Sequence, residues 1–500
     1  MNHKPKSFRF PVLLLCLMWS LSACDKGPID FTESRYPENI HQIVTTNCAV
    51  EGCHIGATSP EGLDLSTWGK AFAGGTRGAV LVPYSADWSH FFQHLNTYST
   101  LGIVGSPVMP PATFSDPLSE ADVTTIRTWI EMGAPNLDGN VKWTEMDSEN
   151  TDKLFVLCAG NDLVAVVNRT TNLVTRYVPV GQLEGVQEAP HFIIFSPDKT
   201  YFYITFLQGG IVEKYRVDNY ELVGRVAVGS DPALMTLNPA GTRMVVSHWN
   251  DAPNAVKLTM VNTDDMSVVQ QVTGSGDLLS FAHGIKVTSD FRTLYVAANQ
   301  GNYVSKYDID ETGFLAEAKI PIEATDPVPQ PSINYKPYDL YMTPDESRLF
   351  ITCSATDEVR VLDLATEEII AKITVGDLPR LMTFDSVSNR LFVACGDQES
   401  FADQGSLKGC VSVVDMDNLT FIKNIYQLGH RPHGVSVDYT NRRLYVASEN
   451  VGGVDPPHHP VQGTAYPPGK FHVVDLNTLE PIADMETEVA EFPNALIVAE

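Results

Sequence analysis

The chain of 500 residues carries 61 aspartate and glutamate residues against 34 lysine and arginine residues, a formal net charge of −27. So acidic a chain repels phosphate backbones, which argues against nucleic acid as a partner. The same charge favours encounters with cations and positively charged proteins, although it also serves simply to keep a protein soluble.

The first 23 residues predict a lipoprotein signal peptide. Three basic residues precede an apolar run over residues 11–21 that is too short to span a membrane as a mature helix. The run ends in LSAC at residues 21–24, which resembles a bacterial lipobox. The resemblance implies a lipid on Cys24, a tether over residues 24–35, and a place in the cell envelope on the periplasmic or outer face. A plain secretory signal is the alternative.

Cys48, Cys53 and His54 form the next pattern, in the string CAVEGCH over residues 48–54. Covalent attachment of haem c requires two thiols for the vinyl groups and an adjacent imidazole for the iron. The usual motif has two residues between its cysteines, and this one has four. The longer form resembles the motif of a group of small bacterial cytochrome c domains. A small-loop disulfide and a zinc site are the alternatives.

Met109 lies in a polar, proline-rich loop, SPVMPP over residues 106–111. Flanking prolines stiffen the backbone and aim the thioether, so we expect Met109 to be the second axial ligand of the haem iron. An iron with histidine and methionine ligands has no vacant position and carries electrons instead of binding substrate. His90, His94 and Met132 are the substitute ligands, and an ordinary core role for Met109 is the alternative.

A helix is predicted after Ser119, which is a good N-cap, and it should end at Gly133. Apolar residues recur on one face at helical spacing. The string WIEMGA at residues 129–134 resembles the closing helix of small cytochrome c domains, which packs over the haem edge. We therefore expect a small all-α cytochrome c domain over residues 36–138 and a linker over residues 139–152.

From about residue 150 the chain repeats a short strand rich in aromatic and β-branched residues. The copies are residues 154–158, 202–206, 244–248, 294–298, 349–353, 391–395 and 444–448. A second short strand, opening at proline or alanine, precedes every copy but the first, and one more copy follows at residues 493–499. This offset lets the C-terminal strand complete the first blade. The sequence therefore predicts an all-β, seven-bladed β-propeller over residues 153–500, closed by its C-terminus.

Two strings, VRVLDLAT at residues 359–366 and ITVGDLP at residues 373–379, resemble the Tyr-Val-Thr-Asn repeat family of propellers. The resemblance covers residues 150–500 and implies a fold more strongly than a function. The order of cytochrome first and propeller second is similar to that of haem-c/propeller nitrite reductases. In those enzymes the propeller carries a second haem.

The residue after each blade's opening position should face one mouth of the central channel. These seven residues are His191, Ala233, His283, Tyr338, Arg380, His433 and Asn494. Three imidazoles, a phenol and a guanidinium suit a metal, a second haem or an anionic substrate, which makes these five the candidate catalytic residues. The alternative is that the histidines only bond neighbouring backbone. His430, and His458 with His459 in the irregular stretch 451–470, are expected near the same face.

These features favour an envelope electron-transfer protein with one haem c and a redox partner such as a basic soluble cytochrome, held at the membrane only by a lipid. Any catalysis should be that of an oxidoreductase. The alternative is a propeller that binds a protein or polysaccharide and carries an accessory cytochrome domain. Cys395 and Cys410 flank a long polar loop and are candidates to pair, whereas Cys158 and Cys353 are expected to be buried strand residues.

Overall fold

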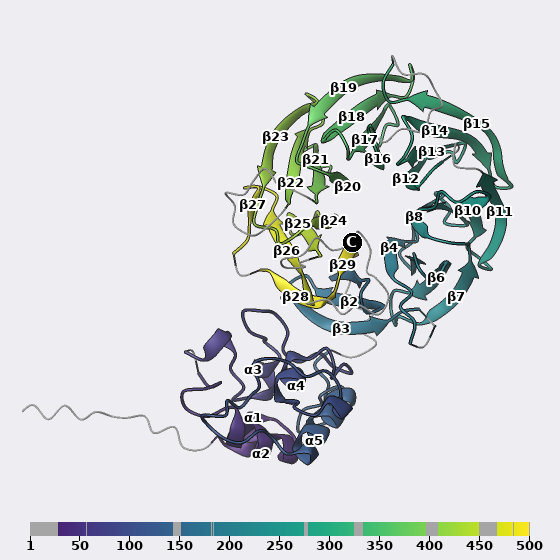
Figure 1. The fold of residues 1–500 in the computed structure, drawn as a ribbon. Coiled ribbons are helices and arrows are strands. Elements are labelled where there is room, and N and C mark those ends of the chain that lie inside the picture. Colours follow the sequence, from purple (N-terminus) through teal and green to yellow (C-terminus); the bar gives the residue numbers. More distant parts are fainter. Residues whose placement is uncertain are drawn as a thin grey trace, which may run out of the picture.

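The computed structural model describes residues 29–143 and 152–499, apart from positions 57, 182 and 184 and the stretches 275–278, 325–333, 397–408, 450–467 and 484. A helical module over residues 29–143 lies against one side of a ring of β-sheets (Figure 1). The predicted signal peptide, the lipidation site Cys24 and the pair His458 and His459 lie outside the described residues.

Five α-helices and two 3₁₀ turns make up the helical module. They are α1 (Phe31–Ser34), α2 (Glu38–Asn47), η1 (Pro60–Gly62), α3 (Trp68–Ala71), α4 (His90–Leu95), η2 (Ser99–Leu101) and α5 (Glu120–Glu131). As the sequence predicts, the Ser119 hydroxyl accepts the backbone N–H of Asp122 and caps α5. The chain leaves α5 at Gly133, whose φ of +93° suits glycine. Helix α1 lies within the segment expected to be a tether.

The module has its own hydrophobic core between α2 and α5. Ile40 and Val44 of α2 and Ile126 and Ile130 of α5 are fully buried, because each helix turns its apolar face inward. The Tyr36 ring packs edge-on against another core ring, that of Trp129, at 6.0 Å between centroids. This core holds in place the loops that carry Cys48 and Met109.

The remaining chain forms seven antiparallel sheets. Blade 1 contains β1 (Lys153–Cys158), β2 (Leu163–Asn168) and β3 (Leu173–Pro179) together with the last strand, β29 (Pro493–Ala499). Blade 2 contains β4 (Pro190–Phe195), β5 (Tyr201–Phe206), β6 (Ile211–Arg216) and β7 (Leu222–Ala227). Blade 3 contains β8 (Pro232–Leu237), β9 (Arg243–His248), β10 (Ala255–Asn262) and β11 (Ser267–Gly274).

Blade 4 contains β12 (Ala282–Val287), β13 (Thr293–Ala298), β14 (Tyr303–Asp310) and β15 (Gly313–Pro321). Blade 5 contains β16 (Pro337–Met342), β17 (Arg348–Cys353), β18 (Glu358–Asp363) and β19 (Glu368–Thr374). Blade 6 contains β20 (Pro379–Asp385), β21 (Arg390–Cys395), β22 (Cys410–Asp415) and β23 (Thr420–Ile425). Blade 7 contains β24 (Pro432–Asp438), β25 (Arg443–Ser448), β26 (Pro468–Asp475), β27 (Glu480–Pro481) and β28 (Thr487–Glu491), and β28 pairs with β26.

The C-terminal strand closes the ring, as the sequence predicts. Strand β29 pairs antiparallel with β1, with Val156 opposite Leu496, so the first blade combines both ends of the propeller. Figure 1 shows the C-terminus at the inner edge of the ring. This closure leaves no open edge between the first and last blades.

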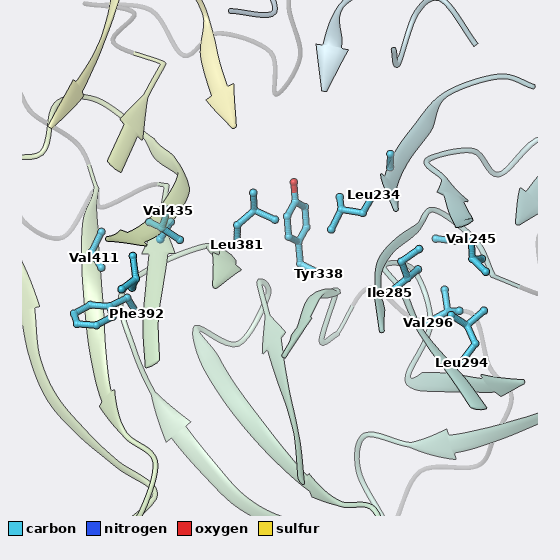
Figure 2. Close-up of a cluster of buried hydrophobic side chains, with 14 of the residues drawn as sticks. Leu234, Val245, Ile285, Leu294, Val296, Tyr338, Leu381, Phe392, Val411 and Val435 are labelled. Carbon is cyan, nitrogen blue, oxygen red and sulfur yellow. The ribbon is translucent and has the colours of Figure 1, made fainter. Parts of the chain in front are cut away.

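Packing between blades explains the recurring apolar strands. The second strand of each blade is buried on both faces, so its residues read as a continuous apolar run instead of alternating. Figure 2 shows the side chains of one such cluster, contributed by several blades, with Tyr338 among them. Cys158 and Cys353 are fully buried in their strands, as expected.

The helical module packs against blades 1 and 7. Ala79 and Val82 of the module belong to one hydrophobic cluster with propeller residues of β1 to β3. The Trp88 ring lies 5.8 Å from that of Tyr177 in β3, and the Arg176 guanidinium lies 4.2 Å above the Tyr84 ring. Among the described residues, no helix has the length and apolar character needed to cross a membrane.

Candidate functional site

A cavity of about 380 Å³ in the helical module gathers the predicted cofactor residues. Cys48, Cys53, His54 and Met109 all line it, although Met109 comes from a segment more than fifty positions further along the chain. Most of the remaining wall is apolar and includes Leu63, Leu65, Ala79, Val80, Phe91 and Leu95. The cavity thus combines two thiols, an imidazole and a thioether in a largely hydrophobic setting.

The segment from Cys48 to His54 is a tight turn at the end of α2. Cys48 donates its backbone N–H to Val44, and its carbonyl accepts the N–H of His54 at 3.1 Å. Gly52 has a φ of +81°, a conformation that other residues rarely adopt, so the four intervening residues fold back and bring Cys53 and His54 to the cavity. Both thiols are free, and burial raises the pKa of Cys48 to about 12.

The His54 imidazole is oriented by one backbone contact. Its Nδ1 donates to the carbonyl oxygen of Leu63 at 3.3 Å, which assigns the proton to Nδ1. Burial lowers the pKa of His54, so the ring is neutral and Nε2 keeps its lone pair. This is the tautomer that a metal-binding histidine uses, and a backbone carbonyl is a common partner for its other nitrogen.

Met109, the predicted second axial ligand, and His94, one of its predicted substitutes, are linked through the backbone. Met109 donates its backbone N–H to the carbonyl of His94 at 2.7 Å, and His94 Nδ1 in turn donates to the carbonyl of Pro107 at 2.6 Å. Both side chains line the cavity. Met109 is partly buried against the module's core, so its loop is less detached from the core than its polar sequence suggests.

The other two substitute ligands differ in position. His90 also lines the cavity and its Nε2 lies 3.5 Å from Glu488 of β28. Met132 follows α5, is 59% exposed and is not among the cavity residues. Among the described residues, no group of three histidine, cysteine or carboxylate side chains is arranged to hold a bare metal ion.

The inner ring, defined as the seven residues predicted to face the channel mouth, comes together in the structure, but all seven residues are buried instead of facing an open mouth. Each member is the second residue of its blade's innermost strand, which in blade 1 is β29. Four of the ring side chains meet across the axis. The His191 and His283 rings lie 5.6 Å apart, the rings of His283 and Tyr338 4.0 Å apart, and those of His191 and His433 6.5 Å apart. Ala233, between His191 and His283 in ring order, is small enough to allow their contact.

The three ring histidines share one hydrogen-bond pattern. Each donates through Nδ1 to the carbonyl of the next member of the inner ring: His191 to Ala233 at 3.4 Å, His283 to Tyr338 at 3.1 Å, and His433 to Asn494 at 2.7 Å. Burial lowers the pKa of all three, so each is neutral with Nε2 as an acceptor. His433 Nε2 faces the Tyr338 hydroxyl at 3.3 Å, whereas His283 Nε2 has no hydrogen-bond partner.

Three residues beside the inner ring were not identified from the sequence: Glu449, Arg431 and Trp249. Glu449 is fully buried, 3.5 Å from Arg380 Nη1 and 3.6 Å from Arg431 Nε, and burial raises its pKa to about 7. The Trp249 ring lies 5.2 Å from His283. Glu449 directly follows the recurring strand of blade 7. The residue at this position is uncharged in the other blades, so the carboxylate could have marked Glu449 as unusual in the sequence. His430, flagged from the sequence, is buried.

Cys395 and Cys410 are direct cross-strand partners in blade 6. Both are fully buried and both are free thiols. The sequence thus placed them correctly at the two ends of one hairpin.

Seven sheets arranged in a ring, which the C-terminal strand closes by pairing with β1, decide the fold (Figure 1). The propeller is seven-bladed. In agreement, a family model described as "Lactonase, 7-bladed beta-propeller" matches residues 208–396. No curated protein matches the chain.

Solved structures resemble the chain at low sequence identity. A functionally unknown protein from Desulfotomaculum acetoxidans shares 11% identity with a TM-score of 0.52, covering 69% of this chain and 98% of its own. Dihydro-haem d1 dehydrogenase NirN, in complex with DHE, shares 14% identity with a TM-score of 0.47, covering 92% and 99%. Hydrazine synthase of Kuenenia stuttgartiensis shares 16% identity with a TM-score of 0.46, covering 63% and 90%. At these identities the first likeness indicates the fold alone, and the other two superpose too loosely to add to it.

Proposed function

We propose that this protein is an envelope electron-transfer protein whose helical module binds one haem c. Cys48 and Cys53 are the covalent attachment points, and His54 and Met109 are the axial ligands. The observation that carries the proposal is the single apolar cavity lined by all four side chains. When bound, the haem supplies one-electron exchange.

The chain's own residues explain why this cavity suits the cofactor. The Leu63 carbonyl fixes the tautomer of His54 and leaves Nε2 free to bind iron. The largely apolar walls suit a hydrophobic cofactor such as a haem. The backbone bond from Met109 to His94 holds the methionine loop beside the same cavity.

The donor set also discriminates against the simpler alternatives. A disulfide between Cys48 and Cys53 would explain neither the cavity nor the orientation of His54. Zinc would require further nitrogen or sulfur ligands in a compact shell, and no such group occurs among the described residues. A large hydrophobic cofactor with two points of covalent attachment accounts for both the volume and the side chains.

The experiment is a pyridine-haemochrome assay on the full chain, exported from a bacterial host that has the haem-c maturation machinery. We expect one haem per chain and a c-type spectrum. A Cys48→Ser/Cys53→Ser variant should lose the covalent haem. A Cys158→Ser/Cys353→Ser variant, which removes two buried thiols of the propeller, is the matched control and should keep it.

We also propose a cellular location and a redox partner, which the N-terminal sequence and the net charge support. Cys24 is the lipid anchor, the membrane is contacted only through that lipid, and the protein lies on the periplasmic or outer face. The net charge of −27 suits a basic soluble cytochrome as the redox partner. Electron transfer to such a partner should weaken as salt concentration rises.

The inner ring is proposed as a second site, for a redox substrate or a further cofactor. It is supported by the fully buried His283, whose Nε2 has no hydrogen-bond partner and whose ring packs against that of His191. Any catalysis there is oxidation or reduction by His191, His283, His433, Tyr338 and Arg380. A propeller that only binds a protein or polysaccharide is the alternative. Substrate-dependent reduction of the haem would favour the redox site, and an inert haem spectrum would favour the binding module.

A further inference from the structure

Blade 6 differs from its neighbours in how its second strand ends. In blades 1 and 5 that strand also ends in cysteine, Cys158 and Cys353, but their cross-strand partners are Leu163 and Glu358. In blade 6 the partner of Cys395 is Cys410. Two thiols therefore face each other in blade 6, while the same position in blades 1 and 5 holds a single thiol.

The hairpin that these thiols close is also different. The turn after Cys158 occupies residues 159–162 and the one after Cys353 occupies residues 354–357, whereas residues 396–409 separate Cys395 from Cys410. Short turns fix a strand pair by themselves, but the entropy cost of closing a hairpin grows with its length. A covalent link at the base of the longest of these three hairpins compensates for that cost.

The geometry suits such a link. Residues directly opposite each other in antiparallel strands have Cα atoms about 4.5–5.5 Å apart, and disulfides require about 4.4–6.8 Å. Cys395 Sγ lies 3.4 Å and Cys410 Sγ 4.0 Å from the same hydroxyl, Ser412 Oγ. The neighbouring Cys395 side chain, together with burial, raises the pKa of Cys410.

We infer that Cys395 and Cys410 form a structural disulfide in the exported protein. An Sγ–Sγ bond forms as the two thiols give up two protons and two electrons. A protein disulfide of the envelope's thiol-oxidoreductase class accepts them by exchange and becomes a dithiol. The inference does not rest on the proposed haem.

Burial determines when this bond forms. Both cysteines are fully buried in the folded blade, and exchange requires an exposed thiolate. The bond therefore forms before blade 6 has packed against its neighbours. Once formed, it is shielded from reductants in the native protein.

The disulfide would stabilise one side of the inner ring. Gly396, which follows Cys395, packs tightly against Arg380 of the inner ring. A Cβ on Gly396 would lie 2.9 Å from Arg380 Nε. At the other end, a Cβ on Gly409 would lie 2.3 Å from the Cδ of Pro432, the residue before His433. Closing the base of the hairpin thus holds the chain against two blade openings of the inner ring.

The test is peptide mapping of the exported full chain, alkylated in denaturant without reductant and cut with trypsin. Cleavage after Arg390, Lys408 and Lys423 gives peptides 391–408 and 409–423, each with one of the two cysteines. We expect one linked species about 2 Da lighter than the sum of the two peptides. Dithiothreitol added to the native protein before alkylation should leave the link intact, whereas dithiothreitol added together with denaturant should break it.

Variants locate the bond. Cys410→Ser should leave Cys395 fully alkylated, and Cys353→Ser, the matched control, should leave the linked species unchanged. Recovery of both peptides alkylated and separate from the exported wild-type protein would overturn the inference. A link from either cysteine to a third one would overturn it as well. Because the mapping detects the sulfur bond directly, it is independent of the haemochrome assay, so the two proposals stand or fall separately.

Discussion

Glu488 of β28 lies 3.5 Å from Nε2 of His90, a residue that lines the cavity of the helical module. The backbone N–H of Glu488 also donates to the carbonyl of Arg77 at 3.2 Å, in the loop that forms another part of the cavity wall. The propeller therefore supports the cavity directly. The two parts of the chain should behave as one folding unit at this contact, although the helical module also has a core of its own.

Gly78→Ala should weaken this contact. Gly78 has a φ of +106°, and a Cβ there would lie 2.9 Å from Cγ2 of Thr487 in β28. Gly139→Ala is the matched control, because Gly139 also has a positive φ, +81°, but no heavy atom lies within 4 Å of the added carbon. We expect a loss of about 1 kcal/mol for the control from backbone strain and roughly 1–2 kcal/mol more for Gly78→Ala from overpacking. Calorimetric unfolding of the two variants measures the difference, and equal losses would show that the contact does not matter.

Glu449 should make the propeller's stability depend on pH. Burial raises its pKa from 4.5 to about 7, so the folded state favours the neutral acid. The stability from this group is complete below pH 4.5 and is lost as pH rises through about 7, by roughly 3 kcal/mol in all. Glu449→Gln keeps the neutral form at every pH, so its stability relative to wild type should rise from pH 4.5 to 8. Denaturant unfolding at several pH values tests this, and a constant difference between the two proteins would contradict it.

His283 and His248 should differ in their contribution to stability. Both are fully buried, but His248 bonds through both nitrogens, to the Ser230 carbonyl at 2.8 Å and to the Thr259 hydroxyl at 2.9 Å. His283 bonds through Nδ1 alone. His248→Ala should therefore destabilise the protein by about 1 kcal/mol more than His283→Ala. Thermal unfolding compares the two, and a larger cost for His283→Ala would assign that residue a structural role.

Met109 and His94 can be distinguished as axial ligands of the proposed haem. If Met109 binds the iron, Met109→Ala abolishes the weak sulfur-to-iron absorption band and lowers the reduction potential, because a thioether ligand raises it. His94→Ala should leave the band in place. Optical spectra and a redox titration of both holoproteins measure this, and a band that survives Met109→Ala would assign the position to another residue.

The repeated strands made the propeller predictable. Each blade's second strand is buried on both faces, so it appears in the sequence as a short continuous apolar run, and seven runs give seven blades. The inner ring followed from the same register. By contrast, β27 and β28 of blade 7 were not foreseen, because Glu480–Pro481 is only two residues long and Thr487–Glu491 has no apolar run.

Contacts between elements were the part that the sequence could not specify. The cysteine–histidine motif indicated which residues would approach a cofactor, because its chemistry is local. The packing of Gly78 on Thr487 and the position of Glu449 between two arginines depend on how separate elements meet in space. The periodicity of apolar residues within one strand or helix does not indicate such contacts. Helix α4, which places His90 and His94 at the cavity, is only six residues long and lacks a strong helical pattern.

Acid–acetone extraction of the purified, exported full chain, followed by its visible spectrum, tests directly whether Cys48 and Cys53 hold a haem covalently. We expect the colour to stay with the wild-type protein, because two thioether bonds retain the haem, and to be extracted from or absent in Cys48→Ser/Cys53→Ser. A colourless wild-type protein from a host competent in haem-c maturation, or colour removed entirely by the extraction, would contradict it.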